Sequence, residues 1–256
     1  MKRTEPKIPN GLNYKIVDDR VIITKSSVIG SLIIPEFIEN LPVTEIEAKA
    51  FYFCVHLKSV NIPEGVTEIG DKAFDYCKHL TSVIIPASVA KIGSDVFFDC
   101  YSLTEIQVAD DNLNYKSIDN VLFSKDGKIL VKYPNWGPSE YRVPDGVTEI
   151  AKYAFLDNVD LRSIIIPNGV TTIGECAFRY HGTLESIIIP ETVTKIEYRT
   201  FFSCKNLTSV TIPASVTEID SEAFYISDQI TIHCFRNSYA QRYADELEIR
   251  VVIMDK

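Results

Sequence analysis

The sequence predicts an α/β repeat solenoid, mostly β, built from coils of 23 residues. Apolar positions recur at constant offsets from a proline, and a cysteine and an Ala-Phe step recur with them. A unit of this length is one supersecondary turn that buries its apolar face only against its neighbours. The marker positions are Pro35, Pro63, Pro86, Ala109, Pro144, Pro167, Pro190 and Pro213. Two gaps depart from 23 residues: 28 after Pro35 and 35 after Ala109.

Each coil has two apolar segments. In one coil the apolar positions are Leu57, Val60, Ile62, Val66, Ile69 and Phe74. The first three precede the proline with the alternation of a strand, and the proline ends that strand because it has no N–H. The next pair and the Ala-Phe step predict a short extended segment followed by one tight helical turn.

The full repeat resembles a known family. Cys54, Cys77 and Cys204 each open a C-x-x-L-x-x-V-x-I-P unit that closes on a phenylalanine, as in bacterial leucine-rich repeats of the BspA-like, or treponemal, type. The match covers about residues 43–225 apart from the long gap. The resemblance implies a right-handed leucine-rich-repeat solenoid, used mostly on bacterial surfaces to attach to host proteins, other bacteria or glycans.

The 256 residues, 46% of them hydrophobic, are expected to form a single domain. We expect an N-terminal cap at 11–34, a first repeat block at 35–108, a hairpin insertion at 109–143, a second repeat block at 144–226 and a C-terminal helix-strand cap at 227–256. Caps are needed because the first and last coils each have one face without a neighbour.

Local signals support the caps and a loop in the first coil. Residues 14–24, YKIVDDRVIIT, indicate a hairpin around Asp18-Asp19. Five extra residues within 36–42 predict a loop that bulges from the first coil. Near the C-terminus, Ser238 and Gln241 have the spacing of a capping box, and a helical apolar stripe follows before a last alternating strand at 249–253.

The insertion changes the composition. The stretch VLFSKDGKILVKY predicts a hairpin around residues 125–128, and Trp136, the only tryptophan, follows it. An aromatic plane on an exposed loop is a usual protein or sugar contact, so Trp136 is a binding candidate; packing against the solenoid edge is the structural alternative. Asp110, Asp111, Asn112 and Asp119 could ligate calcium, although no calcium-loop spacing is present.

The outward positions of the strands form the other candidate site. In the second block they are Arg162, Ser163, Ile165, Glu185, Ser186 and Ile188. Ile165 and Ile188 hold the same place in consecutive coils, so they should form an apolar stripe with polar edges, as in a protein interface. The structural alternative is that β-branched residues simply suit a strand.

The cysteines at intervals of 23 predict a ladder of buried, reduced thiols. Equivalent side chains of parallel coils point the same way, whereas a disulfide needs Cβ atoms turned toward each other. The alternative, a metal or redox site, lacks any C-x-x-C pair. His56 and His79 should be near neighbours, but two imidazoles without a carboxylate make a poor metal site. We therefore expect no metal and no cofactor.

Composition and motifs exclude several classes of function. The net charge of -9 predicts no nucleic-acid partner. No catalytic motif is present, so we expect a monomeric, non-enzymatic binding module with a protein or glycan ligand. No apolar run is long enough for membrane insertion. The family resemblance favours a secreted or cell-surface location with a leader upstream of Met1; a cytoplasmic scaffold is the alternative.

Overall fold

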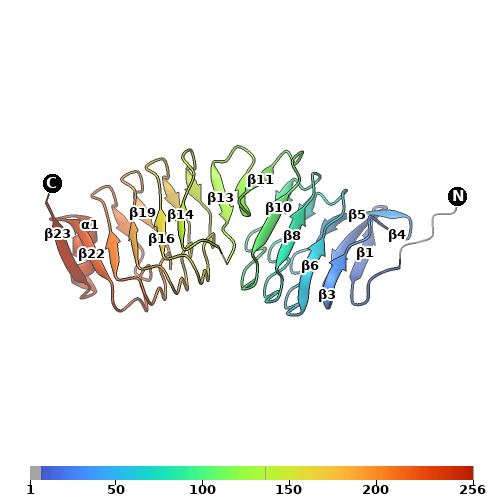
Figure 1. The fold of residues 1–256 in the computed structure, drawn as a ribbon, viewed down its shortest axis with the longest axis horizontal. Helices are drawn as coiled ribbons and strands as arrows, with labels where there is room; N and C mark the ends of the chain where they lie inside the picture. Colours follow the sequence, from blue (N-terminus) through green and yellow to red (C-terminus); the bar gives the residue numbers. More distant parts are fainter. Residues whose placement is uncertain (1–6, 136, 256) are drawn as a thin grey trace. The chain divides into compact units, whose positions relative to one another are not determined.

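The computed structural model describes residues 7–135 and 137–255. It contains two compact units, residues 1–126 and 127–256, and each is described by itself (Figure 1). The expectation of a single domain therefore stays a prediction.

Unit 1 has a hairpin, two series of parallel strands and a second hairpin. Its strands are β1 (Asn13–Val17), β2 (Arg20–Thr24), β3 (Gly30–Ile33), β4 (Phe37–Ile38), β5 (Leu41–Ile46), β6 (Leu57–Asn61), β7 (Glu68–Ile69), β8 (Ser82–Ile85), β9 (Lys91–Ile92), β10 (Glu105–Val108), β11 (Tyr115–Ile118) and β12 (Val121–Ser124). One sheet has the order β10-β8-β6-β3, and the other runs β1-β2-β5-β7-β9. Each regular coil gives one strand to each sheet.

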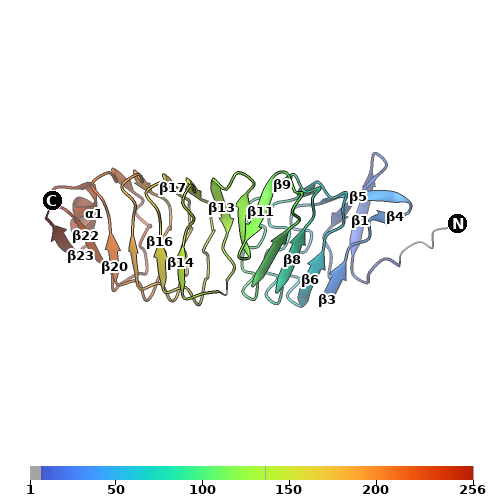
Figure 2. The same ribbon diagram turned by 45° about the horizontal axis from the view of Figure 1, so that its top comes forward.

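The strands of unit 2 repeat this plan. They are β13 (Ile129–Lys132), β14 (Glu140–Arg142), β15 (Glu149–Ile150), β16 (Ser163–Ile165), β17 (Thr172–Ile173), β18 (Ser186–Ile188), β19 (Lys195–Ile196), β20 (Ser209–Thr211), β21 (Glu218–Ile219), β22 (Thr231–Phe235) and β23 (Arg250–Met254). The first strands of the coils form the sheet β14-β16-β18-β20-β22-β23, and they lie side by side in Figure 2. The second strands pair as β13-β15-β17 and β19-β21.

The core of each unit is a set of columns with one residue from each coil. Phe51 and Phe74 stack with ring centroids 5.1 Å apart, and Phe155 and Phe178 stack at 5.0 Å. These rings are completely buried. Repetition at 23 residues therefore places like side chains on one another, which is the packing that the sequence period predicts.

The expected helical turn after the second strand is wrong. The chain there makes successive tight turns, such as the one closed by the Ala50 N–H on the Glu47 carbonyl at 3.1 Å, with Lys49 at φ +60°. A positive φ at the third residue is typical of a type II turn. Alternate N–H groups donate to the next coil, as Phe51 does to the Ala73 carbonyl at 2.7 Å. These bonds between coils replace the bonds that a helix would make within itself. We call this series of turns, which lies between the second strand and the cysteine column of each coil, the arc; in this coil it is residues 47–53.

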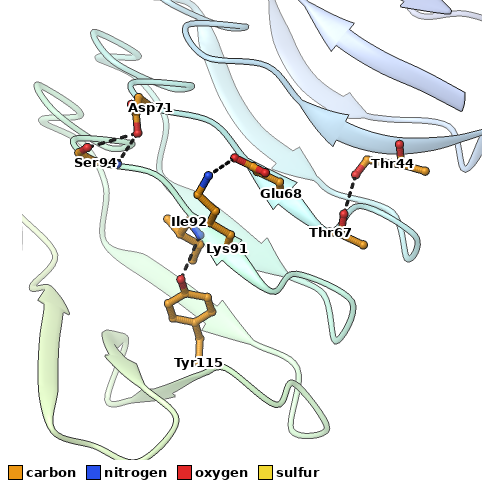
Figure 3. Close-up of polar contacts among 8 residues, drawn as sticks. All are labelled: Thr44, Thr67, Glu68, Asp71, Lys91, Ile92, Ser94 and Tyr115. Atoms are coloured by element: carbon orange, nitrogen blue, oxygen red, sulfur yellow. Dashed lines mark hydrogen bonds and ion pairs between the residues drawn. The ribbon is translucent and has the colours of Figure 1, made fainter. Parts of the chain in front are cut away.

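The insertion follows the coil register further than expected. Tyr115 lies 23 residues after Ile92, and its hydroxyl accepts a hydrogen bond from the Ile92 N–H at 3.0 Å (Figure 3). Other bonds in Figure 3 also join residues 23 apart, including the 2.6 Å pair of Lys91 with Glu68. The period therefore continues to Tyr115 and breaks only after it.

A hairpin that the sequence reasoning did not mark is β11–β12, which turns at Asp119-Asn120 with both residues at positive φ. Asp and Asn adopt this left-handed conformation more readily than most residues. The stretch predicted to form a hairpin around residues 125–128 supplies β12 and β13, the two strands that the prediction requires.

Both ends have the elements predicted for them. The β1–β2 hairpin turns at Asp18-Asp19, and the five extra residues of the first coil form the short hairpin β4–β5. At the other end α1 (Tyr239–Glu246) begins at Ser238, whose hydroxyl accepts from the Gln241 N–H. This helix connects β22 to β23, which pair in parallel, so the strand sheet continues beyond residue 230.

Candidate binding surfaces

The strand face of unit 2, which we define as the outward side of β14, β16, β18 and β20, carries the predicted isoleucine stripe. Ser163 pairs with Ser186, and two residues later on the same strands come Ile165 and Ile188. Their exposed fractions are 52% and 67%, while Ile164 between Ser163 and Ile165 is buried. The sequence placed these side chains correctly on the outward side.

The polar residues beside the stripe are also exposed. The Arg162 guanidinium and the Glu185 carboxylate form an ion pair at 3.3 Å with both side chains mostly in solvent. A pair of that kind contributes at most about 1 kcal/mol to stability, so it is easily rearranged by a partner. The structure thus brings six of the seven predicted residues onto one face. Trp136 lies outside the described residues.

Threonines in the column before the strands have a structural role. The Thr81 hydroxyl donates to the Lys58 carbonyl at 3.0 Å, and Thr208 donates to the Glu185 carbonyl at 3.2 Å. These hydroxyls satisfy main-chain groups between coils, so they leave less hydrogen-bonding capacity for a ligand. The exposed isoleucines make no such contribution to the coil, because their side chains point away from it.

The arc of unit 2 carries a second group of arginine and aromatic side chains, half-buried or exposed except for the buried Phe202, that the sequence reasoning missed. The Arg179 guanidinium lies 4.5 Å from the centroid of the Tyr180 ring, and Arg199 lies 4.8 Å from that of Phe202. Arg199 also pairs with Glu222 at 2.7 Å. Tyrosine and arginine are enriched at the energetic centres of interfaces. A sequence signal did exist, because an aromatic residue stands two places before the cysteine column at Tyr52, Phe98 and Phe202.

The predicted ladder of buried thiols is confirmed. The Sγ atoms of Cys77 and Cys204 donate to the Phe51 and Phe178 carbonyls at 3.2 and 3.0 Å. Six cysteines are free and buried. Burial raises the pKa of Cys204 to about 12, so this thiol stays protonated and unreactive at neutral pH.

Asn158 and His181 occupy the same column. The Asn158 amide donates to the Pro134 carbonyl at 2.9 Å and accepts from the Leu161 N–H at 2.7 Å. His181 accepts from the Leu184 N–H through Nδ1 at 3.2 Å, but its Nε2 has no partner within the described chain. Burial lowers the pKa of His181 to about 3, so the ring is neutral. Both residues thus accept a main-chain N–H three residues further along their coil.

The residues considered as metal ligands do not form a site. Asn112 is buried, and its amide donates to the Pro86 and Val89 carbonyls and accepts from the Asn114 and Tyr115 N–H groups. His56 and His79 stack at 5.8 Å, as the spacing predicted. In residues 7–135 and 137–255 no group of three or more His, Cys, Asp or Glu side chains could hold a metal ion.

One carboxyl in unit 1 is strongly perturbed. Asp75 is buried on the arc, and its Oδ1 has no hydrogen-bond partner among the described residues. Burial raises the pKa of Asp75 to about 6, Lys72 opposes the shift, and the negative charges of Asp99 and Asp95 add to it. Desolvation, with a smaller contribution from the neighbouring carboxylates, accounts for the raised pKa of Asp75.

These observations define the class of protein. It is a repeat protein whose coils stack on one another and whose outward faces are available for binding. The chain belongs to the BspA-type leucine-rich repeat family, whose repeat region matches residues 28–131 and 138–243 in six copies. No curated protein matches the sequence. No helix in the described part of the chain is long and apolar enough to span a bilayer.

Solved structures of bacterial proteins share the fold. The pneumococcal vaccine antigen PcpA has a TM-score of 0.57 at 17% identity, with 97% of this chain and 98% of that chain covered. A leucine-rich repeat protein from Eubacterium ventriosum has a TM-score of 0.56 at 21% identity, with 88% and 82% covered. A leucine-rich cell surface protein from Faecalibacterium prausnitzii has a TM-score of 0.53 at 22% identity, with 95% and 98% covered. At these identities the likeness shows the fold.

Proposed function

We propose that this chain is a non-enzymatic adhesion module of a bacterial surface or secreted protein, and that it binds a host or bacterial protein or glycan through the strand face of unit 2. The observation that supports it most is the pair Ile165 and Ile188, exposed in consecutive strands. Side chains in equivalent places of adjacent parallel strands lie about 4.8 Å apart, so the two form one apolar strip with polar residues on either side.

Two further observations support the proposal. The described strands leave no neighbouring element over this strip, and Arg162 beside it offers a planar guanidinium for a carboxylate or an aromatic ring. The family and the cell-surface location of the Faecalibacterium protein favour an extracellular setting. The partner is expected to bind one copy of this chain as a monomer, without a cofactor.

The test replaces both isoleucines, Ile165→Lys and Ile188→Lys. Burying an isoleucine contributes about 1.5–3 kcal/mol to an interface, so losing two should weaken partner capture at least about 100-fold. Because Ile164 and the other inward residues are untouched, the melting temperature should stay within a few degrees. The measurement is capture from extracellular matrix extract and from lysate of the producing cell, with the amount retained compared between wild type and variant.

A matched control makes the same isoleucine-to-lysine substitutions on unit 1. Ile33→Lys and Ile84→Lys change exposed isoleucines of the sheet β10-β8-β6-β3 and should leave capture unchanged. Equal capture by wild type and the Ile165/Ile188 variant would exclude the strand face of unit 2. Variant-sensitive capture from the lysate alone would favour the cytoplasmic scaffold instead.

A further inference from the structure

An open cleft of about 1160 Å³ lies at the C-terminal end of unit 2. One wall is the arc of the last coil, residues 221–231, and the other is the end of α1 with the start of β23. The residues that the argument uses are Tyr225, Ile226, Asp228, Tyr243, Asp245 and Glu248. None of them belongs to the strand face of unit 2.

The last arc has a main-chain donor without an acceptor. In the preceding coil the Phe201 N–H donates to the Ala223 carbonyl at 2.8 Å, and the Ser203 N–H donates to the Tyr225 carbonyl at 2.9 Å. The equivalent groups 23 residues later belong to Phe224 and Ile226, after which no further arc follows. Within the described residues the Ile226 N–H makes no hydrogen bond. The cleft therefore exposes the edge of the ladder that joins the coils.

A second donor comes from the helix. Tyr243 is 6% exposed. The Phe224 main-chain N–H faces its hydroxyl oxygen, while the hydroxyl proton has no acceptor among the described residues. Burial raises the pKa of Tyr243 to about 12, so the hydroxyl keeps its proton. A buried hydroxyl proton without an acceptor is costly, and a carbonyl entering the cleft would remove that cost.

The charges around the cleft are mainly negative. Asp228, Asp245 and Glu248 are exposed and form no ion pair with the described residues, and Arg250 is the single cationic side chain lining the cleft. Tyr225, with 59% of its surface exposed, presents an aromatic ring on the same wall. Carboxylates and an exposed ring together favour a cation over an anion.

We propose that this cleft binds an extended peptide that carries arginine or lysine. The peptide main chain supplies carbonyl oxygens to the Ile226 N–H and the Tyr243 hydroxyl, in the way that an added strand continues a sheet edge. Its basic side chains lie against Asp228, Asp245 and Glu248 and over the Tyr225 ring. This binding is separate from the proposed adhesion through the strand face, so either can fail without the other.

The test is a titration of the full ¹⁵N-labelled chain, followed by amide chemical shifts, with two probes. The peptide acetyl-Leu-Arg-Leu-Arg-Leu-amide should shift the Ile226 and Leu247 amides and bind at least about 10-fold more tightly than acetyl-Leu-Glu-Leu-Glu-Leu-amide. Equal affinity for the two peptides, no binding of the arginine peptide at millimolar concentration, or an unshifted Ile226 amide at saturation would overturn the proposal.

Variants assign the effect to the cleft. Asp228→Asn with Glu248→Gln should weaken binding of the arginine peptide about 10-fold, and Tyr243→Phe, which keeps the ring and removes the donor, should weaken it severalfold. Glu140→Gln with Glu191→Gln is the matched control, because it removes the same charge from exposed positions elsewhere on unit 2. If the control weakens binding as much as the cleft variant does, general electrostatic attraction explains the binding and the proposal is wrong.

Discussion

His181 stands in the column that holds cysteine in other coils, and it satisfies that position only in part. Cysteine is small and donates one hydrogen bond to a carbonyl of the previous coil, as Cys204 does to Phe178. Histidine fills the same buried place with a larger ring, accepts the Leu184 N–H and leaves the Nε2 proton unpaired. Unit 2 therefore contains a buried imidazole whose protonated form is disfavoured in the folded state.

We predict that unit 2 loses stability in mild acid because of His181. Its folded pKa, about 3, lies below the 6.5 of an unperturbed histidine, so the unfolded chain binds more protons between these values. The stability contributed by the neutral ring is complete above pH 6.5 and falls as pH decreases, by up to about 1.4 kcal/mol per pH unit. Denaturant unfolding of unit 2 at pH 7 and pH 5 should differ by about 2 kcal/mol.

The variant His181→Cys restores the ladder residue and should remove most of that difference between pH 7 and pH 5. Replacing the exposed His56 by Asn is the control and should retain the wild-type difference. If wild type and His181→Cys depend on pH equally, then His181 is not the group responsible.

At the scale of elements, the β11–β12 hairpin is attached to the regular coils through Tyr115. Its hydroxyl accepts from the Ile92 N–H, which lies at the end of β9, and the Ser117 hydroxyl accepts from the Val108 N–H at 3.1 Å. These side chains take the place that a main-chain acceptor of another coil would occupy. The hairpin thus supplies hydrogen-bond acceptors for main-chain N–H groups at the end of unit 1, where the repeat stops.

We predict that Tyr115→Phe destabilises unit 1 by about 1–3 kcal/mol, because it leaves the Ile92 N–H without its acceptor while keeping the ring. The measurement is denaturant unfolding, with amide hydrogen exchange to localise the effect to β9 and β11. Tyr52→Phe, at an exposed tyrosine of the same unit, is the control and should change stability by less than about 0.5 kcal/mol. An Ile92 amide that exchanges at the wild-type rate would contradict the anchoring function of Tyr115.

At the scale of the whole molecule, the number of reactive thiols reports on the folding of both units. The six cysteines are buried, with Cys54 the most accessible at 6% exposure. Unreduced protein should show less than one reactive thiol when native and six in denaturant. Fewer than six thiols in denaturant without a reductant would mean that disulfides form. The result holds for a surface or a cytoplasmic setting, because the coil interior excludes oxidants from either.

The sequence by itself determined the architecture of the coils. A period of 23 places Phe51 over Phe74 and Cys54 near Cys77, and alternation before each proline decides that Ile165 and Ile188 point outward while Ile164 points inward. The caps followed from equally local signals, Ser238 with Gln241 and the turn at Asp18-Asp19. These features depend on neighbours along the chain or one period away, so a linear pattern contains them.

Tertiary structure decided what depends on contacts outside that pattern. The tight turns of the arc could not be distinguished from a helical turn by spacing, because bonds to the next coil hold them open. The chain pattern likewise did not show that Tyr115 still keeps the coil register, since a side-chain hydroxyl replaces a main-chain acceptor there. The cleft beside Ile226 exists because the repeat ends and α1 crosses over it. Only the positions of both walls in space bring Tyr243 and three carboxylates together.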